Sequence, residues 1–223
     1  MKAASFQIRL CENPECGLRY PAVELHLIGD RCPACLGTTR LVLTRTLENE
    51  PQMPSNNPDR SPFVALLDNI RSAWNVGSIF RTSEGYGLQH IHLCGITPRP
   101  GNTDLGKTAL GAENNIPWTY HKNSVPAAER LKRDSHQLWA LESDPRAIPI
   151  SEVELPQGLS SQLSGIALIV GNEETGVDPG LLDICNKIIY LPMRGEKRSF
   201  NVAVAFGIAI QFLGFLFQKN NSH

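Results

Sequence analysis

The stretch Ile188–Phe217, IIYLPMRGEKRSFNVAVAFGIAIQFLGFLF, opens with an apolar β-type run that stops at Pro192, crosses a short charged loop and enters a long apolar segment. The segment from Val202 onward predicts a helix, and a helix that is apolar on nearly every face is buried in protein or in lipid. Lipid is the weaker option, because the longest uninterrupted apolar run ends at Gln211, short of the roughly 18 to 20 residues that a membrane span requires. We therefore expect a core helix, no membrane partner, and one helix face that packs against a second copy of the chain.

Two polar residues stand where this loop becomes a helix. Ser199 is the expected N-cap, because its hydroxyl can accept a hydrogen bond from the free amides of the first helical turn. Asn201 has no such local role in the sequence, and an amide inside an apolar run must find a partner or cost free energy. Asn201 is therefore a candidate ligand contact.

The length and composition of the chain limit the classes of protein to which it can belong. Its 223 residues suit one medium domain and a small module, and 21 Lys and Arg against 22 Asp and Glu give a net charge of −1. No overall basic charge indicates a nucleic-acid partner, although a local basic patch would be sufficient for one. The start of the chain lacks the apolar core of a secretory signal, so a cytoplasmic location is expected. In that compartment the six cysteines are expected to be thiols or metal ligands rather than disulfides.

Four cysteines form two closely spaced pairs, Cys11-ENPE-Cys16 and Cys32-PA-Cys35. Tetrahedral zinc takes four soft ligands, and short spacers with glycine or proline bring two thiolates onto one ion. The stretches AVELHLIG and TTRLVLTRTLE alternate as strands do. We predict a zinc-ribbon-like module over residues 1–48, with four unliganded thiols as the alternative. A module of this size has too little core to hold without the metal.

The remainder of the chain divides into a linker, a main domain and a tail. Residues 49–61 are rich in Pro, Asn and Ser and are expected to form the linker, and residues 219–223 a disordered tail. Residues 62–218 alternate between strand-like and helical patterns, which predicts an α/β domain with a parallel sheet covered on both faces. The expected strands are residues 63–68, 90–96, 118–121, 136–142, 165–171 and 187–192, and the expected helices are residues 76–87, 126–134, 178–185 and the segment after Asn201.

Three polar, glycine-containing loops follow apolar strands of this domain, after Leu67, Val170 and Leu191. In open parallel sheets, ligands collect at the carboxyl ends of the strands, so these loops are expected to form one site. Neither a Gly-x-Gly-x-x-Gly fingerprint nor a phosphate loop ending in Gly-Lys-Ser is present, which argues against a standard dinucleotide-binding fold and an NTPase.

The same loops carry NVGSIFRT from Asn75 to Thr82, LIVGNEETG from Leu168 to Gly176, and LPMRGEKRSFNVAVA from Leu191 to Ala205. Together these stretches resemble the three motifs of the SpoU/TrmH family of RNA ribose 2′-O-methyltransferases, in that family's order. The resemblance covers roughly residues 62–217. Two departures are visible, Phe200 where the family usually has Leu and Ala203 where Ser is common, and both exchanges are mild.

The resemblance implies a SPOUT-type α/β fold whose C-terminal part is threaded as a deep trefoil knot, an S-adenosylmethionine pocket built from the knotted loops, and a homodimer with its active site near the subunit contact. The cofactor contacts would fall on Gly171, Leu191, Met193, Ser199, Phe200 and Asn201. The catalytic set would be Arg81, Asn75, Glu173, Ser199 and Asn201, with Arg81 at the position of the family's catalytic arginine.

General chemistry limits what Arg81 can do. A guanidinium with a pKa above roughly 12 is a poor proton acceptor. We therefore expect Arg81 to grip the neighbouring phosphate and stabilise the developing alkoxide, and whether Ser199 or water takes the proton stays open. In the glycine-rich segment 98–118, Arg99, Lys107 and Thr108 are candidates for RNA phosphate contacts, with a solvated loop as the alternative.

The sequence therefore predicts an S-adenosylmethionine-dependent enzyme that methylates the ribose 2′-hydroxyl of a tRNA or rRNA nucleotide. One alternative is a non-catalytic RNA-binding or assembly protein that retains the fold, and another is a knotted methyltransferase that acts on a base or a small molecule. The cysteine module would serve as an added RNA-binding element, or equally as a protein contact or a dimer-stabilising element.

Overall fold

The computed structural model describes residues 5–23, 31–46, 61–159, 163–197 and 199–221. The chain forms two compact units, Met1–Pro58 and Asp59–His223. The predicted linker at 49–61 falls almost entirely outside the described residues.

The first unit is a three-stranded antiparallel sheet made of β1 (Ser5–Cys11), β2 (Arg19–Val23) and β3 (Thr39–Thr46), in the order β2-β1-β3. The strand predicted from TTRLVLTRTLE is confirmed as β3. Of the stretch AVELHLIG, the first two residues belong to β2 and the others lie outside the described residues. Strand β1 is absent from the sequence-based prediction.

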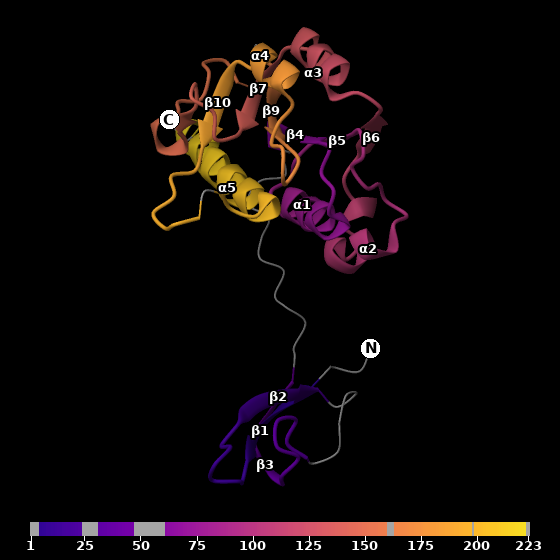
Figure 1. Ribbon diagram of the computed structural model, residues 1–223, viewed down its shortest axis with the longest axis vertical. Helices are drawn as coiled ribbons and strands as arrows, with labels where there is room; N and C mark the ends of the chain where they lie inside the picture. Colours follow the sequence, from indigo (N-terminus) through magenta and orange to yellow (C-terminus); the bar gives the residue numbers. More distant parts are fainter. Residues whose placement is uncertain (1–4, 24–30, 47–60, 160–162, 198, 222–223) are drawn as a thin grey trace. The chain divides into compact units, whose positions relative to one another are not determined.

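The second unit is built on a seven-stranded sheet in which every neighbouring pair is parallel (Figure 1). The strand order is β6-β5-β4-β9-β7-β10-β8. The predicted α/β class and parallel sheet are confirmed. The strands are β4 (Phe63–Asp68), β5 (His90–Cys94), β6 (Trp118–His121), β7 (His136–Leu141), β8 (Ile148–Pro149), β9 (Gly165–Val170) and β10 (Lys187–Tyr190).

Helices cover both faces of this sheet (Figure 1). Residues of α1 (Ala73–Gly85), α2 (Thr103–Ala109) and α5 (Val202–Asn221) share a core with one face, and residues of α3 (Ser124–Arg133) and α4 (Pro179–Ile184) share a core with the other. Two short 3₁₀ turns, η2 (Ala112–Asn114) and η3 (Ile150–Glu152), complete the described elements. Helix α2 lies in the segment that the sequence left without regular structure.

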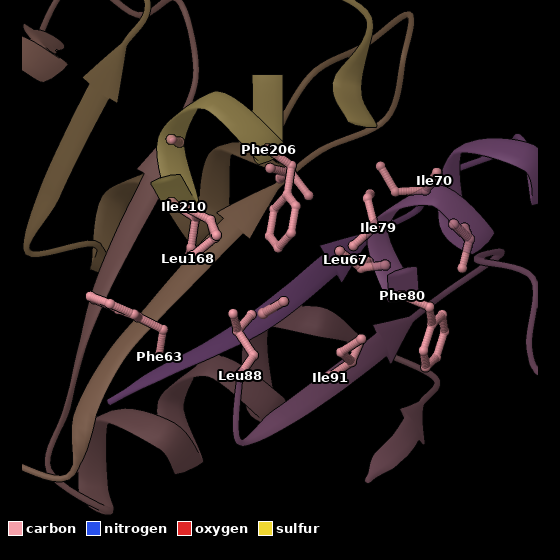
Figure 2. Packing of buried hydrophobic residues seen from close by; sticks show 14 of the residues in the cluster. Phe63, Leu67, Ile70, Ile79, Phe80, Leu88, Ile91, Leu168, Phe206 and Ile210 are labelled. Atoms are coloured by element: carbon pink, nitrogen blue, oxygen red, sulfur yellow. The ribbon is translucent and has the colours of Figure 1, made fainter. Parts of the chain in front are cut away.

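The larger core lies under α1 and α5 (Figure 2). Phe206 and Ile210 of α5 pack with Leu168 of β9, while Phe63, Leu67, Ile79 and Phe80 bring in β4 and α1. Burying one such side chain stabilises the fold by roughly 1.5 to 3 kcal/mol. This core fixes the start of α5 beside the carboxyl ends of β9 and β10.

Helix α5 is only half buried within this chain. Phe206, Ala209, Ile210 and Leu213 are buried, whereas Val204, Ile208 and Phe215 are 51%, 42% and 58% exposed. One face of α5 is therefore a core face, as expected, and the opposite face is left exposed by a single copy of the chain. By length and composition α5 also qualifies as a candidate membrane span, a test that the core helix of a soluble protein passes equally well. The helix continues to Asn221, so the predicted tail is wrong for residues 219–221.

Three histidines meet on the sheet face that α3 covers. His92 Nδ1 lies 3.1 Å from His121 Nε2. The Thr119 hydroxyl oxygen lies 3.1 Å from each of three ring nitrogens, His90 Nε2, His92 Nδ1 and His121 Nε2. Burial, reinforced by the neighbouring His90, His121 and His136, lowers the pKa of His92 to about 3. Folded His92 therefore stays neutral at acidic pH.

This burial predicts acid sensitivity. Because the folded pKa of His92 lies below the unfolded value of about 6.5, its contribution to stability is complete above pH 6.5 and is lost as the pH falls. The wild-type protein should lose about 1 to 2 kcal/mol more unfolding free energy between pH 6.5 and 5.0 than a His92→Gln variant, measured by urea unfolding at a series of pH values. Parallel curves for the two proteins would contradict this account.

Candidate functional site

Two of the three polar loops predicted from the sequence, those after Val170 and Leu191, line one cavity of about 320 Å³ on the carboxyl edge of the sheet. The third loop, after Leu67, does not line the cavity but is hydrogen-bonded to Glu173 in its wall. The cavity wall includes residues from the ends of β7, β9 and β10 and from the start of α5. All six predicted cofactor contacts line it: Gly171, Leu191, Met193, Ser199, Phe200 and Asn201.

Glu173 ties the loop after β9 to the start of α1. One carboxylate oxygen accepts a hydrogen bond from the Arg71 amide (2.8 Å), and the other accepts from the Ser72 amide (3.1 Å) and Asn75 Nδ2 (2.8 Å). Burial alone would raise the pKa of Glu173, but these donors outweigh it and hold the pKa below the ordinary value. The carboxylate is therefore ionised at neutral pH.

Asn201 extends this link to the third loop. Its Nδ2 donates to Asn75 Oδ1 (3.0 Å), while its Oδ1 accepts from the Ala203 and Val204 amides (3.0 and 3.3 Å). Asn201 is thus the N-cap of α5, and the assignment of that role to Ser199 is wrong. The inference that Asn201 lacks a local role is wrong for the same reason. Its side-chain nitrogen, Nδ2, still makes a contact within the site, the hydrogen bond to Asn75.

Four of the five predicted catalytic residues gather here. Glu173, Asn75 and Asn201 form one hydrogen-bonded chain, and the exposed Ser199 lines the same cavity. Asn75 joins the site through these hydrogen bonds without lining the cavity. Arg81 is the exception, because it is exposed on α1 and belongs neither to this hydrogen-bonded chain nor to the cavity wall. Arg81 follows Asn75 by six residues, and at 3.6 residues per turn the two side chains leave different sides of the helix.

Glu142, at the end of β7, is a site residue that sequence reasoning missed. Its two carboxylate oxygens accept hydrogen bonds from the Ser143 amide (2.7 Å) and the Val177 amide (3.0 Å), which holds the loop Gly171–Val177 against β7. A Cβ on Gly176 would lie within 2.4 Å of this carboxylate. The signal was present, since Glu142 is a polar residue directly after the apolar strand HQLWAL.

The glycine that opens this loop cannot be enlarged. Gly171 and Gly176 lie back to back, so a Cβ on Gly171 would approach the Gly176 carbonyl to 2.3 Å. Gly171→Ala should therefore displace the loop and weaken binding of S-adenosylmethionine, the cofactor that the sequence resemblance implies, by at least about tenfold, as measured by calorimetry. Gly195→Ala is a matched control, because a Cβ there meets nothing within 4 Å. Equal affinities of the two variants would contradict the loop's role.

The four paired cysteines converge in the first unit. The Sγ atoms of Cys11, Cys16, Cys32 and Cys35 all lie within 4.8 Å of one another, with Cys11 and Cys35 at 3.4 Å and Cys16 and Cys32 at 3.8 Å. Four sulfurs around a tetrahedral zinc at 2.3 Å are about 3.8 Å apart. The donor set and its spacing therefore fit a tetrahedral, thiophilic metal ion.

Comparison with known families and curated proteins adds an independent observation. Residues 62–211 match the model described as the SpoU rRNA Methylase family. A 23S rRNA (guanosine(2553)-2′-O)-methyltransferase of Bacillus subtilis is 31% identical over 161 residues, which is 72% of this chain and 61% of that protein. A tRNA (guanosine(18)-2′-O)-methyltransferase of Borreliella burgdorferi is 26% identical over 156 residues, covering 70% and 67%. The chain spans about three fifths of the length of the first two curated relatives.

Solved structures share the fold of the second unit. The A. aeolicus TrmH/SpoU tRNA modifying enzyme superposes with a TM-score of 0.61 at 22% identity, covering 73% of this chain and 78% of that chain. An AdoMet-bound rRNA methyltransferase from Sinorhizobium meliloti gives a TM-score of 0.62 at 22% identity, covering 70% and 56%. At these identities the likeness concerns the fold alone.

Proposed function

This chain belongs to the SpoU rRNA methylase family, and on that premise we propose that it transfers a methyl group from S-adenosylmethionine to the ribose 2′-hydroxyl of a tRNA or rRNA nucleotide. The observation that carries the proposal is the hydrogen-bonded chain Glu173–Asn75–Asn201, which joins all three sequence motifs beside one cavity. Named 2′-O-methyltransferases among the relatives support the reaction type.

The cavity fits the cofactor in size and character. Its volume of about 320 Å³ lies within the usual range of small-molecule sites. Leu191, Met193 and Phe200 provide an apolar wall for an adenine ring, and the loop glycines leave room for a ligand to approach the backbone. When bound, S-adenosylmethionine supplies an electrophilic methyl group on a sulfonium sulfur.

The residues around the cavity position the ribose and stabilise the transition state, and they form no covalent bond with the substrate. Methyl transfer is an in-line displacement, so the main task is to hold the ribose oxygen in the right direction. The Asn75–Asn201 pair, anchored by ionised Glu173, forms a rigid edge at the start of two helices. We assign to Ser199 a contact with the 2′-hydroxyl, because it lines the cavity and is exposed, and it is one of two candidate proton acceptors, the other being water.

The outer face of α5 suits a homodimer contact. Val204, Ile208 and Phe215 form an exposed apolar stripe, and a hollow on the same face is lined by Ile208, Phe212 and Phe215. Thr82 of α1 lies next to Gly207 of α5, which also lines this hollow, and the preceding residue, Arg81, is exposed. We assign the stripe to a second copy of the chain, which would bring Arg81 of one subunit to the cavity of its partner.

The dimer contact is testable by one substitution. Ile208→Glu places a charge in the stripe and should convert the dimer to a monomer, as measured by sedimentation at micromolar concentration. Ile96→Glu is the control: it changes an exposed isoleucine outside α5, 64% exposed against 42% for Ile208, and should leave the dimer intact. A wild-type monomer, or a dimer that survives Ile208→Glu, would remove this part of the proposal.

In the first unit we propose a structural zinc ion held by Cys11, Cys16, Cys32 and Cys35. The support is the four-thiol donor set and its near-tetrahedral sulfur spacing.

The reaction is tested with S-adenosylmethionine carrying a tritiated methyl group. Total tRNA and rRNA from cells that lack this gene are the acceptors. Label entering one RNA class supports the proposal and identifies that class. Cofactor binding without label in any RNA would favour a non-catalytic RNA-binding role, and label on a base would favour a base methyltransferase.

A further inference from the structure

A second hollow, of about 620 Å³, lies at the carboxyl ends of β5 and β6, separate from the cofactor cavity. Trp118 and Tyr120 of β6 both line it, because residues two apart on a strand project from the same face. The Tyr120 hydroxyl donates to the Gly95 carbonyl (2.9 Å), which fixes the ring. Ile96, 64% exposed, adds apolar surface at the rim.

A cation completes this aromatic surface. The guanidinium carbon of Arg99 lies 4.5 Å from the centroid of the Tyr120 ring. Guanidinium and phenol planes stack readily with other flat π systems, and the guanidinium also supplies positive charge. The hollow therefore presents a flat, positively charged surface with a preset geometry.

This surface connects to the catalytic edge through α2. Asn102, which also lines the hollow, caps α2, and Lys107 near the end of α2 lies 5.9 Å from the Trp74 ring centroid. The Thr108 hydroxyl donates to the Trp74 carbonyl (3.0 Å), and Trp74 is 54% exposed. Trp74 directly precedes Asn75, so a second exposed aromatic and cation pair lies between the hollow and the cavity.

The spacing suits a nucleic-acid strand. Strand β6 is three strand positions from β9, whose end forms the cofactor cavity, and neighbouring strands lie about 4.8 Å apart. The hollow is therefore on the order of 15 Å from the cavity, a separation that an extended single strand crosses within a few nucleotides.

We propose that this hollow binds an unpaired nucleobase of the RNA substrate, a short distance along the strand from the methylated nucleotide, by stacking on Tyr120 and Arg99. The inference rests on the proposed RNA substrate and adds a binding subsite to it. Unpaired bases are recognised by stacking on aromatic rings and on guanidinium planes, which is the chemistry present here. Trp74 and Lys107 provide the next contact toward the cavity.

The test is binding of a fluorescently labelled single-stranded oligouridine, compared with an oligonucleotide of the same length whose central positions are abasic. Tyr120→Ala should weaken oligouridine binding about tenfold, within the range measured for one base–aromatic stack. Its effect on the abasic probe should be less than about twofold, because that probe keeps the phosphates but has no base to stack. Tyr120→Phe keeps the ring and should bind both probes as the wild type does.

Two variants that each remove one cation distinguish the contribution of charge to RNA binding from the contribution of stacking. Arg99→Ala should weaken binding of the oligouridine more than of the abasic probe. Lys122→Ala removes an exposed cation just beyond β6 and outside the hollow, and should affect both probes equally. A 5-iodouridine oligonucleotide should crosslink to Trp118 or Tyr120, identified by mass spectrometry.

Two results would overturn the subsite. One is a wild-type protein that does not distinguish the two probes, and the other is a Tyr120→Ala variant, folded by thermal melting, that loses equal affinity for both. Because these experiments need no methyl transfer, their failure leaves the methylation result standing, and a failure to methylate leaves the binding result standing.

Discussion

Replacing Arg81 by Ala is expected to lower the rate of methyl transfer by roughly 100-fold to 1,000-fold while leaving the affinity for S-adenosylmethionine unchanged. A side chain that stabilises developing negative charge contributes a factor of this size to the rate. Arg81 does not line the cofactor cavity of its own chain, so cofactor affinity should not depend on it. Single-turnover kinetics and calorimetry measure the two quantities separately.

The control for this substitution is Arg133→Ala, which removes an exposed arginine from the last turn of α3 on the opposite face of the sheet and should leave both quantities unchanged. Arg81→Lys should recover little activity, because an ammonium group cannot replace the bidentate guanidinium fork. Wild-type rates in Arg81→Ala would remove this residue from the catalytic set.

Subunit mixing tests where Arg81 acts. If Arg81 serves the partner's cavity, mixing inactive Arg81→Ala subunits with inactive Glu173→Gln subunits should restore about a quarter of the wild-type activity, because mixed dimers contain one intact site. If Arg81 serves its own cavity, every site in the mixture carries a defect and no activity returns. The second result would contradict the proposed dimer arrangement.

The second large effect is expected in the cysteine module. Cys32 is fully buried and its sulfur lies 3.8 Å from that of Cys16, so Cys32→Ser should abolish tight zinc binding and unfold strands β1–β3. Zinc coordination contributes about 10 to 16 kcal/mol to folding in small zinc modules, far more than this sheet can gain from its own core. Zinc content per chain and amide hydrogen exchange in these strands measure the result.

Cys185→Ser provides the matched control, because this partly buried thiol belongs to the second unit and is not one of the four clustered thiols. It should retain one zinc per chain. A wild-type protein that contains no zinc, or strands that stay protected after chelation, would contradict the metal assignment.

Most elements of the second unit could be predicted from the sequence, because each has an apolar pattern that is visible within its own residues. The run FVALLD is apolar up to its last residue, Asp68, and became the fully buried β4, and the wholly apolar GIALIV became β9. Helix α2 was missed because its seven residues contain a central glycine and a narrow apolar face, and it forms where Asn102 caps its first turn. The order of the strands in the sheet could not be predicted from local patterns either, because it depends on the crossover connections between distant parts of the chain.

The sequence predicted which residues meet at the site more accurately than it predicted the role of each residue. All six cofactor residues reached one cavity, because each follows a parallel strand and those strands end at the same edge. Asn201 was misjudged because an N-cap is recognised only once the first helical residue is known. Arg81 lies in the right motif but outside the cavity, and no pattern within one chain indicates what a second copy contributes.

The most direct test of the account is the chemical identity of the methylated product. RNA labelled by the wild-type protein should yield, after alkaline hydrolysis, a labelled dinucleotide that resists cleavage, because a 2′-O-methyl group removes the hydroxyl that attacks the phosphate. Nuclease digestion of that dinucleotide should then release a 2′-O-methyl nucleoside. Label recovered only on a mononucleotide base, or no label despite S-adenosylmethionine binding, would contradict ribose methylation as the function of this protein.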